Sequence, residues 1–595
     1  MKKCCCMLLC AVLLAGCTST SAPATDGTTS PEMTPSTAGI YQAGTYTATA
    51  DGNNGPLTVQ VTFSTSAIEQ VEVTEQSETE SIASEALESI PAAIVEAQST
   101  EVDTVSGATV TSNAILSAVN DCIEQAGGTV ESESAFAQGE DVSTQIVVVG
   151  GGLAGLSAAL SAANQGSEVI LVEKQGQVGG SALLTGAGIY ATETDVVPAS
   201  VETQDEMYEH ILDMIDDGGT LDHVDTDRIR HLVDESDDII AWLESLGMEF
   251  SAGSVGILNA KEHYHSLADG SSGPGQVAIM EEAAKEAGVQ ILLNTQCVAL
   301  LDDNGTVTGI TVEDSNANTT YNINAQAVIL AAGGYAQNEE MMRRYMPASL
   351  YSTTLANIGA TGEVIDQALA VGASLYPYQF MLACGTSTDV SIGLNMAAAT
   401  GAFVNSNGRR FCNEHRLWQI DAEMVNNADL APYYVIYDST HISQENVAAL
   451  DAAVADHNPY VIKADTLEEL ARKADLKDVE GFVQDLENYS SVAGTDQLDP
   501  DFGVPGDRVV AVTDGPFYAV IVYPINAGTI GGIRTNISGE VLDAEDNAIA
   551  GLYAAGEISN GDLYDNGYIS GTSVLNCYVA GRDAGNSAAA YVSGN

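Results

Sequence analysis

The fold is decided by the stretch Gln145-Ile146-Val147-Val148-Val149-Gly150-Gly151-Gly152-Leu153-Ala154-Gly155. An apolar strand is followed by a G-x-G-x-x-G turn, and a helix is predicted from Leu156 to about Gln165. A second strand is predicted over residues 168–172 and ends at Glu173. In such a β-α-β unit the turn glycines let a pyrophosphate approach the helix N-terminus, and the acid binds a ribose hydroxyl. The stretch therefore predicts a Rossmann-like α/β domain that binds a dinucleotide.

Other segments match further contacts of a flavin dinucleotide. They are Gly179-Gly180-Ser181, Thr185-Gly186-Ala187-Gly188, Val328 to Gly334, Gly551 to Glu557 and Gly581 to Gly585. With these motifs, residues 143–595 resemble the FAD-dependent fumarate reductase and flavocytochrome c family, with 3-ketosteroid dehydrogenases as more distant relatives. The resemblance implies non-covalent FAD. The implied FAD contacts are Gly150, Gly152, Ala154, Gly155, Glu173, Lys174, Gly179, Gly180, Ser181, Gly186, Gly188, Ala332, Gly333, Gly556, Glu557, Ser573 and Val574.

The resemblance also implies a cap domain that is inserted into the FAD domain and closes over the substrate. We expect the FAD domain at residues 143–376 and 528–595 and an α+β cap at residues 377–527. The cap core matches the family in Gly401-Ala402-Phe403-Val404-Asn405 and in Gly408 to Glu414. Thr529-Ile530-Gly531-Gly532 matches the segment that returns from the cap.

The cationic residues that would bind a dicarboxylate in this family are replaced. Met381-Leu382 stands at the position of the cap histidine, and Asn395 and Ala398 stand at those of the proton-relay Glu and Arg. Trp418 replaces the catalytic arginine. Ala527-Gly528 replaces the histidine pair, and Tyr568 replaces the second clamping arginine. Fumarate is therefore not the expected substrate. Aromatic residues in the same segments favour an aryl or neutral enone-like acceptor; they are Tyr376, Tyr378, Phe380, Trp418, Tyr523 and Tyr568.

Two residues are candidate catalytic proton donors. Tyr568 stands at a substrate-contact position, and a phenol can act as an acid or hydrogen-bond an enolate oxygen. A packing role on the flavin wall is the alternative. Arg416 lies two residues before the lost arginine, so a small shift in register could make it the acid, and a surface ion pair is its alternative. His263 and His265 could line the substrate mouth, although exposed loop histidines are common.

Residues 41–129 predict a small α+β domain. Strands are expected at 58–63 and 68–73, and helices at 81–97 and about 112–126. Before the last helix, Ser106-Gly107-Ala108-Thr109 follows Asp103. These residues resemble the FMN-binding domain of sodium-pumping quinone reductases and exported flavin reductases. The resemblance implies FMN attached covalently to Thr109 through its phosphate by a flavin transferase, although such a tetrad can also simply open a helix.

The N-terminus resembles a lipoprotein signal. Lys2 and Lys3 precede an apolar run from Cys4 to Leu14 that is too short to span a bilayer. The run ends in Leu14-Ala15-Gly16-Cys17, which predicts a signal peptide at residues 1–17, cleavage before Cys17 and a lipid anchor on that cysteine; an ordinary apolar segment is the alternative. Flexible linkers are expected at residues 18–40 and 130–142.

Composition excludes several classes of function. Acidic residues number 82 against 19 basic ones, and the net charge of −63 argues against nucleic-acid binding. None of the ten cysteines forms a C-x-x-C pair, so no metal site, disulfide framework or c-type haem is expected.

Together these features predict an exported reductase on the extracytoplasmic face of the cell membrane. It would take electrons from a membrane or extracellular flavin chain, as in anaerobic respiration. The electrons would pass from FMN to FAD and then to a small unsaturated acceptor that is not a simple dicarboxylate. The alternatives are a ketosteroid-type dehydrogenase, a fumarate reductase and a flavin electron carrier without catalysis.

Overall fold

The structure, a computed structural model, describes residues 41–52, 55–76, 78, 80–100, 102, 105, 108–127, 136–215, 223–253, 264–383, 387–388, 401–414, 416–565 and 568–594. The chain divides into two compact units, Met1–Ala135 and Phe136–Asn595. Within the described residues, no helix is both long enough and apolar enough to cross a membrane.

The N-terminal unit is a three-stranded antiparallel sheet with two helices. Its strands run in the order β1 (Gly44–Asp51), β2 (Pro56–Phe63) and β3 (Ile68–Glu75). Alternate residues of β2, from Leu57 to Phe63, are buried against α1 (Glu80–Ala97) and α2 (Thr109–Gln125). This period-two burial is what one apolar sheet face under two helices requires.

The second helix of this unit begins three residues earlier than predicted. Ser112, the expected first residue, lies inside α2. Its hydroxyl donates to the carbonyl of Ala108 and accepts from the amide of Val105. These bonds place the start of the helix upstream, at Thr109.

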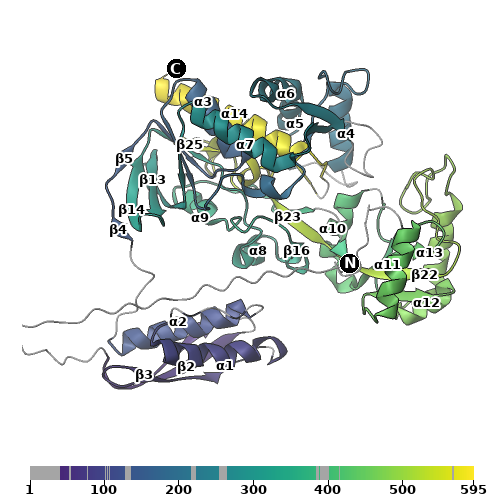
Figure 1. Cartoon of the computed structure of the whole chain (residues 1–595), viewed down its shortest axis with the longest axis horizontal. Coiled ribbons are helices and arrows are strands. Elements are labelled where there is room, and N and C mark those ends of the chain that lie inside the picture. The colour runs from purple at the N-terminus through teal and green to yellow at the C-terminus, as the bar shows by residue number, and fades with distance from the viewer. Residues whose placement is uncertain are drawn as a thin grey trace, which may run out of the picture. The chain divides into compact units, whose positions relative to one another are not determined.

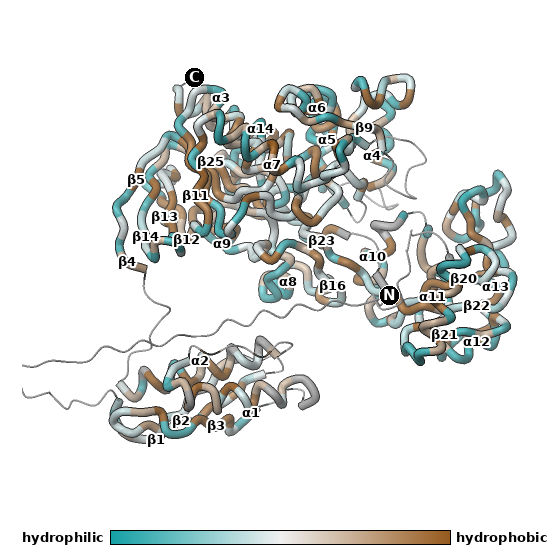
Figure 2. Tube along the Cα trace, viewed as in Figure 1, coloured by the Kyte–Doolittle hydropathy of each residue, from teal (hydrophilic) through white to brown (hydrophobic). Residues whose placement is uncertain are grey.

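The larger unit is built on a six-stranded sheet, which confirms the Rossmann-like α/β fold. Its order is β11 (Gln290–Leu293), β7 (Val169–Glu173), β6 (Ile146–Val149), β15 (Ala327–Leu330), β25 (Ala548–Ala554) and β24 (Glu540–Leu542). All neighbours are parallel except β24 and β25. These central strands are strongly hydrophobic because both faces of the sheet are covered (Figure 2).

Each face of this sheet packs against a different layer. One face, including Ile146 and Val148, packs under α3 (Leu153–Asn164), α7 (Ser272–Glu286) and α14 (Thr572–Ser593), which lie side by side (Figure 1). The other face, including Val147 and Val149, packs against a second sheet. That sheet consists of β12 (Thr295–Asp302), β13 (Val307–Asp314) and β14 (Thr319–Asn324), with β4 (Ala137–Gln138) and β5 (Val142–Ser143) paired to β14.

Two details of the sequence prediction change here. Residues 137–142 were expected in a linker, but β4 and β5 pair with β14 because the edge of that strand offers free hydrogen-bonding groups. Helix α3 begins at Leu153 rather than Leu156, directly after the turn, with Gly152 as its N-cap.

Smaller elements connect these layers. One small sheet has the order β8 (Ile189–Tyr190), β10 (Tyr264–Leu267) and β9 (Phe250–Gly253). Between β8 and β9 the chain forms three helices, α4 (Gln204–Ile215), α5 (Thr226–Asp234) and α6 (Ser236–Ser245). A further sheet joins β16 (Thr353–Thr354), β23 (Ile525–Ile530) and β17 (Phe380–Ala383). Helices α8 (Glu339–Tyr345) and α9 (Glu363–Ala370) precede β17.

A separate group of elements lies within residues 387–523, inside the range predicted for the cap. Its sheet has the order β18 (Ser387–Thr388), β22 (Phe517–Tyr523), β20 (Tyr433–Asp438) and β19 (Ala402–Val404), and β21 (Val461–Ala464) also pairs with β22. Its helices are α10 (Leu417–Asn426), α11 (Gln444–Ala455), α12 (Leu467–Lys473) and α13 (Val479–Ser491). Strands β17 and β23, which pair with each other, flank this group in the sequence, and β23 lies between the group and the rest of the unit (Figure 1).

Candidate flavin site and acceptor-side residues

The glycine turn between β6 and α3 is shaped by close backbone contacts. Gly150 has a φ of 105°, and a Cβ there would lie 2.4 Å from the carbonyl oxygen of Ala331. A Cβ on Gly155 would lie 1.9 Å from the carbonyl oxygen of Gly150. Gly152, by contrast, has no atom within 4 Å of its ideal Cβ position. The turn is therefore tightly packed against protein on two sides and open at the N-terminus of α3, where an anionic pyrophosphate fits.

The acid at the end of β7 is held by backbone amides. Glu173 is buried, and its two carboxylate oxygens accept from the amides of Gly151 at 2.7 Å and Gln175 at 2.8 Å. Next to it, the Lys174 ammonium donates to Glu363 at 2.6 Å and to Thr361 at 2.5 Å. Burial alone would raise the pKa of Glu363, but the hydrogen bonds from Lys174 and Thr361 outweigh it and lower that pKa.

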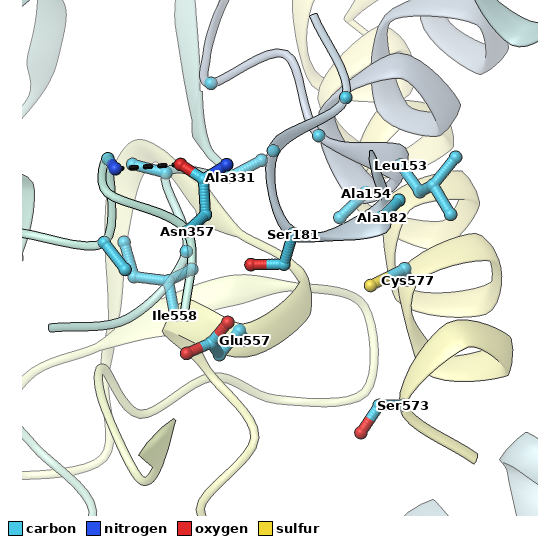
Figure 3. A pocket seen from close by; sticks show the side chains of 18 of the residues that line it. Leu153, Ala154, Ser181, Ala182, Ala331, Asn357, Glu557, Ile558, Ser573 and Cys577 are labelled. Carbon is cyan, nitrogen blue, oxygen red and sulfur yellow. Dashed lines mark hydrogen bonds between the residues drawn. The ribbon is translucent and has the colours of Figure 1, made fainter. Parts of the chain in front are cut away.

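These groups open into one cavity of about 490 Å³. Figure 3 shows Ser181, Glu557 and Cys577 around the same space, although they come from three distant parts of the chain. The predicted FAD contacts that line the cavity are Gly150, Gly152, Ala154, Glu173, Lys174, Gly179, Gly180, Ser181, Gly186, Gly188, Ala332, Gly333, Glu557, Ser573 and Val574. The structure therefore brings together most of the residues expected to hold FAD, and a glycine-lined cavity with a free helix N-terminus fits that cofactor.

Two of the predicted contacts have a different position. Gly155 does not line the cavity, because it faces the turn carbonyl of Gly150. Gly556 has a φ of 85°, and a Cβ there would lie 2.7 Å from the Cβ of Ala154. Both glycines allow the close packing of backbone segments around the cavity, so their role is to support its shape.

Several lining residues were missed by sequence reasoning. They are contributed mainly by the start of β12 and the segment before α9, and include Thr295, Gln296, Cys297, Asn357, Gly359 and Gly362. Asn357 accepts a hydrogen bond of 2.7 Å from the side-chain amide of Gln175, which links this segment to the end of β7. No local sequence motif marks these positions. In the structure, the ion pair of Lys174 with Glu363 joins the end of β7 to the start of α9.

Burial raises the pKa of one carboxyl and one thiol that line the cavity. The Glu557 carboxyl accepts from the amide of Thr529 at 2.8 Å, but burial dominates and raises its pKa. Burial likewise raises the pKa of Cys577 to about 12. Cys577 is therefore a neutral thiol at physiological pH.

Four uncharged residues line the end of the cavity next to the cap. Its lining includes Leu382 of β17, Ala527 of β23, Tyr568 and Ser570; we call these four residues the cap-side end. The Tyr568 ring packs edge-on against Tyr564, with 5.4 Å between ring centroids. Among the described residues that line the whole cavity, Lys174 is the only Lys, Arg or His, and it pairs with Glu363.

Arg416, the second candidate donor, does not line the cavity among the described residues. It occupies the N-cap position of α10, and its guanidinium lies 3.9 Å from the Asp213 carboxylate on α4. The side chain of Trp418 lies outside the described part of the structure, as does His263. His265 is fully buried and bonded to Thr194 at 2.7 Å, so it does not lie at an exposed mouth.

Most of the other aromatic residues expected near the acceptor have packing roles. Tyr376 is bonded to Arg228 and Asp562, and Phe380 is buried in the core. Tyr523 packs against Tyr460, with centroids 6.1 Å apart. Among the members of this group whose side chains are described, only Tyr568 lines the cavity, because hydrogen bonds and core packing hold Tyr376, Phe380 and Tyr523 elsewhere.

In the N-terminal unit, the predicted attachment residue Thr109 is the first residue of α2. In the first turn of this helix, the Thr111 hydroxyl donates to Glu78 at 2.5 Å. Asp103, Ser106 and Gly107 lie outside the described residues. A helix N-terminus at this point suits a phosphate group.

Comparison with known proteins assigns the family. The sequence profile of the FAD binding domain matches residues 145–574. The chain belongs to this family. The profile of the FMN-binding domain matches residues 52–124 of this flavoprotein, within its N-terminal unit. The prediction of an FAD domain preceded by an FMN-binding domain is therefore confirmed.

Three relatives place the flavoprotein among reductases. A probable fumarate reductase of Shewanella frigidimarina is 31% identical, with 77% of this chain and 76% of the relative covered. A urocanate reductase of Eggerthella lenta is 29% identical, with 92% of both chains covered. The open conformation of a flavocytochrome c3 fumarate reductase superposes with a TM-score of 0.56 at 27% identity, covering 83% of this chain and 85% of that one. The flavoprotein is thus an FAD-dependent oxidoreductase of the fumarate reductase-like group, whose members act on CH–CH or C=C bonds.

Proposed function

We propose that this flavoprotein reduces the C=C bond of an aryl-acrylate or enone-like acceptor rather than a simple dicarboxylate. The bound flavins supply the electrons and the hydride, with FMN as the inlet and FAD beside the acceptor. The protein must bind the acceptor at the cap-side end and supply the proton. Similarity to a urocanate reductase over 92% of both chains supports an acceptor that carries an aromatic ring.

The observation that carries this proposal is the neutral lining of the cap-side end. Leu382, Ala527 and Tyr568 stand at positions where the family resemblance implies cations, and the one lysine of the described lining is paired with Glu363. Burying a carboxylate without a partner is costly, typically 2–5 kcal/mol for each unpaired charge. A dicarboxylate therefore binds poorly here, whereas an aryl ring packs against Leu382 and Tyr568 at little cost.

Tyr568 is the proposed proton donor. It lines the cavity, and its ring is oriented by edge-on packing against Tyr564. A phenol can give its proton to the carbon next to the one that receives hydride, or hydrogen-bond a carbonyl oxygen on which charge develops. Arg416 remains the alternative donor, and in that case it must leave Asp213 when the cap closes.

The remaining proposals concern where the protein works and how it is loaded. The signal-like segment that ends at Cys17 favours export and a lipid anchor at the extracytoplasmic membrane face. A flavin transferase would attach FMN to Thr109, and a membrane or extracellular flavin chain would then supply electrons. The net charge of −63 suits an acidic protein held near the membrane by lipid rather than by electrostatic attraction to anionic headgroups.

The test is anaerobic reoxidation of the chemically reduced, flavin-loaded protein. The panel contains fumarate, urocanate, cinnamates, neutral enones and a 3-ketosteroid. Rapid reoxidation by an aryl acrylate or enone, with little by fumarate, is the expected result. Reoxidation by fumarate alone would show a fumarate reductase, and no reoxidation by any member would favour an electron carrier. The reverse assay, desaturation of a saturated ketosteroid with an artificial electron acceptor, identifies a dehydrogenase.

A further inference from the structure

The segment that leads into α5 and the first turns of that helix carry two side chains, His223 and Arg228, that bridge the same pair of chain segments. One bridged segment is residues 376–378, which lead into β17. The other is residues 562–565, which lead toward Tyr568. The first segment continues into β17, which contributes Leu382 to the cap-side end. The second precedes Tyr568, which lines the same end.

The inner bridge is permanent and buried. The Arg228 guanidinium donates to the Tyr376 hydroxyl at 2.8 Å and to Asp562 at 3.0 Å, and Tyr376 itself donates to Asp562 at 2.9 Å. Burial would lower the pKa of Arg228, but the attraction of Asp562 and Tyr376 outweighs it and raises that pKa. Arg228 therefore stays charged beside Asp562.

The outer bridge lies two residues further along each segment. The Nε2 of His223 donates to the carbonyl oxygen of Tyr564 at 3.0 Å, and an Asp565 carboxylate oxygen lies 3.8 Å from the same nitrogen. The imidazole stacks on Tyr378, with 4.1 Å between centroids and 23° between planes. The ring thus uses its face on one segment and its N–H on the other, a combination that neither an amide nor a phenyl side chain offers.

We propose that His223 is a positioning residue for acceptor binding, which sets the spacing of Leu382 and Tyr568 across the cap-side end. The Tyr378 ring packs against the ring of Phe380, with 6.2 Å between centroids, and Phe380 begins β17, the strand that carries Leu382, so a shift of Tyr378 is passed along β17 to Leu382. Tyr564 carries the bonded carbonyl and also the ring that orients Tyr568. This inference rests on the proposed function, because it concerns the same acceptor site.

Three substitutions separate the two halves of the bridge. His223→Gln keeps an N–H donor without the ring, His223→Phe keeps the ring without the donor, and His223→Ala removes both. With the best acceptor of the panel, we expect KM to rise about tenfold in His223→Ala, since one hydrogen bond and one stacking contact are lost. The two partial variants are expected to lie between wild type and alanine, with FAD content and kcat changed less than twofold.

His231→Gln is the matched control. His231 lies on α5, the helix that follows His223, but pairs with Asp583 of α14 at 2.8 Å, away from the cap-side end. This control should leave KM unchanged. An unchanged KM in His223→Ala, or a KM that rises equally in the control, would overturn the proposal.

A spectroscopic test does not depend on finding the acceptor. In protein with ¹³C-labelled histidine and tyrosine, stacking on Tyr378 should shift the His223 ring protons upfield, and Tyr378→Leu should abolish that shift. His223→Ala should move the ring resonances of Tyr568, while His231→Gln should not. If no panel member reoxidises the protein but these shifts appear, the proposed function fails, while the control of the Tyr568 position by His223 stands. If the Tyr568 resonances are the same in His223→Ala and wild type, the positioning role is wrong.

Discussion

Alanine at two glycines of the same turn should produce opposite effects. At Gly155 the new Cβ would lie 1.9 Å from the carbonyl oxygen of Gly150, at least 1.1 Å short of the 3.0 Å below which real Cβ contacts are essentially never seen. At Gly152 the new Cβ meets no protein atom within 4 Å, and the φ of −71° suits any residue. One substitution therefore strains the protein itself, and the other changes only the space in front of α3.

The expected magnitudes follow from these distances. Gly155→Ala must push α3 away from the turn, which overpacks the core and should cost about 1–3 kcal/mol of unfolding free energy or more. Gly152→Ala should change the stability of the apoprotein by less than about 1 kcal/mol, because alanine restricts the unfolded chain without native strain but is a poorer N-cap than glycine. If the FAD pyrophosphate lies at the N-terminus of α3, the same methyl group should weaken FAD binding more than tenfold, or about 1.4 kcal/mol.

The assay measures each variant twice. Thermal unfolding of the FAD-free protein gives stability, and titration of FAD by flavin fluorescence gives the dissociation constant. Gly166→Ala is a useful reference, since it lies in the loop after α3 with no atom within 4 Å of its Cβ position but has a φ of 89°. It should lose stability and keep FAD affinity. Unchanged FAD affinity in Gly152→Ala would refute the placement of the pyrophosphate at this helix.

Three further predictions concern other sites. Tyr568→Phe should lower single-turnover reduction of the acceptor by about 10²–10⁴-fold while leaving FAD content unchanged, and a loss below tenfold would point to another donor. Thr109→Ala, coexpressed with a flavin transferase, should lack the mass of FMN that wild type carries, whereas retained FMN would place the attachment elsewhere. The hydrogen bond from His231 to Asp583 raises the pKa of the histidine, so its stabilising effect is present below its unfolded pKa and is lost as pH rises through the higher folded value. His231→Gln should therefore lower the melting temperature more at pH 6 than at pH 9, and an equal loss at both would mean that the pair contributes no pH-dependent stability.

The parts of the fold that were predictable are those with local signatures. The strand, glycine turn, helix and acid of residues 145–173 each satisfy a short-range physical requirement, so their arrangement follows from spacing alone. The helix starts were wrong by three residues at both α2 and α3. At α3 the cap is a glycine without a side chain to mark it.

The wall of the cavity opposite the glycine turn could not be predicted in the same way. Cys297 and Asn357 are brought to it by long-range packing, and neither belongs to a recognisable motif. The positions of the aromatic residues could not be predicted either. Tyr376 and Tyr568 have the same side chain, but Arg228 hydrogen-bonds Tyr376 within a buried network. Which tyrosine lines the cavity depends on that tertiary contact.

The central claim is that the cap-side end binds neutral or aryl acceptors and rejects dicarboxylates. Its most direct test is stopped-flow reoxidation of one reduced preparation by cinnamate, by methyl cinnamate and by fumarate, measured side by side at one ionic strength. Each uncompensated carboxylate should cost more than about 30-fold in the second-order rate constant, from a penalty of at least ~2 kcal/mol. Fumarate should be the slowest of the three. Fumarate reacting as fast as or faster than the cinnamates would contradict that claim and would require a cation at the cap-side end.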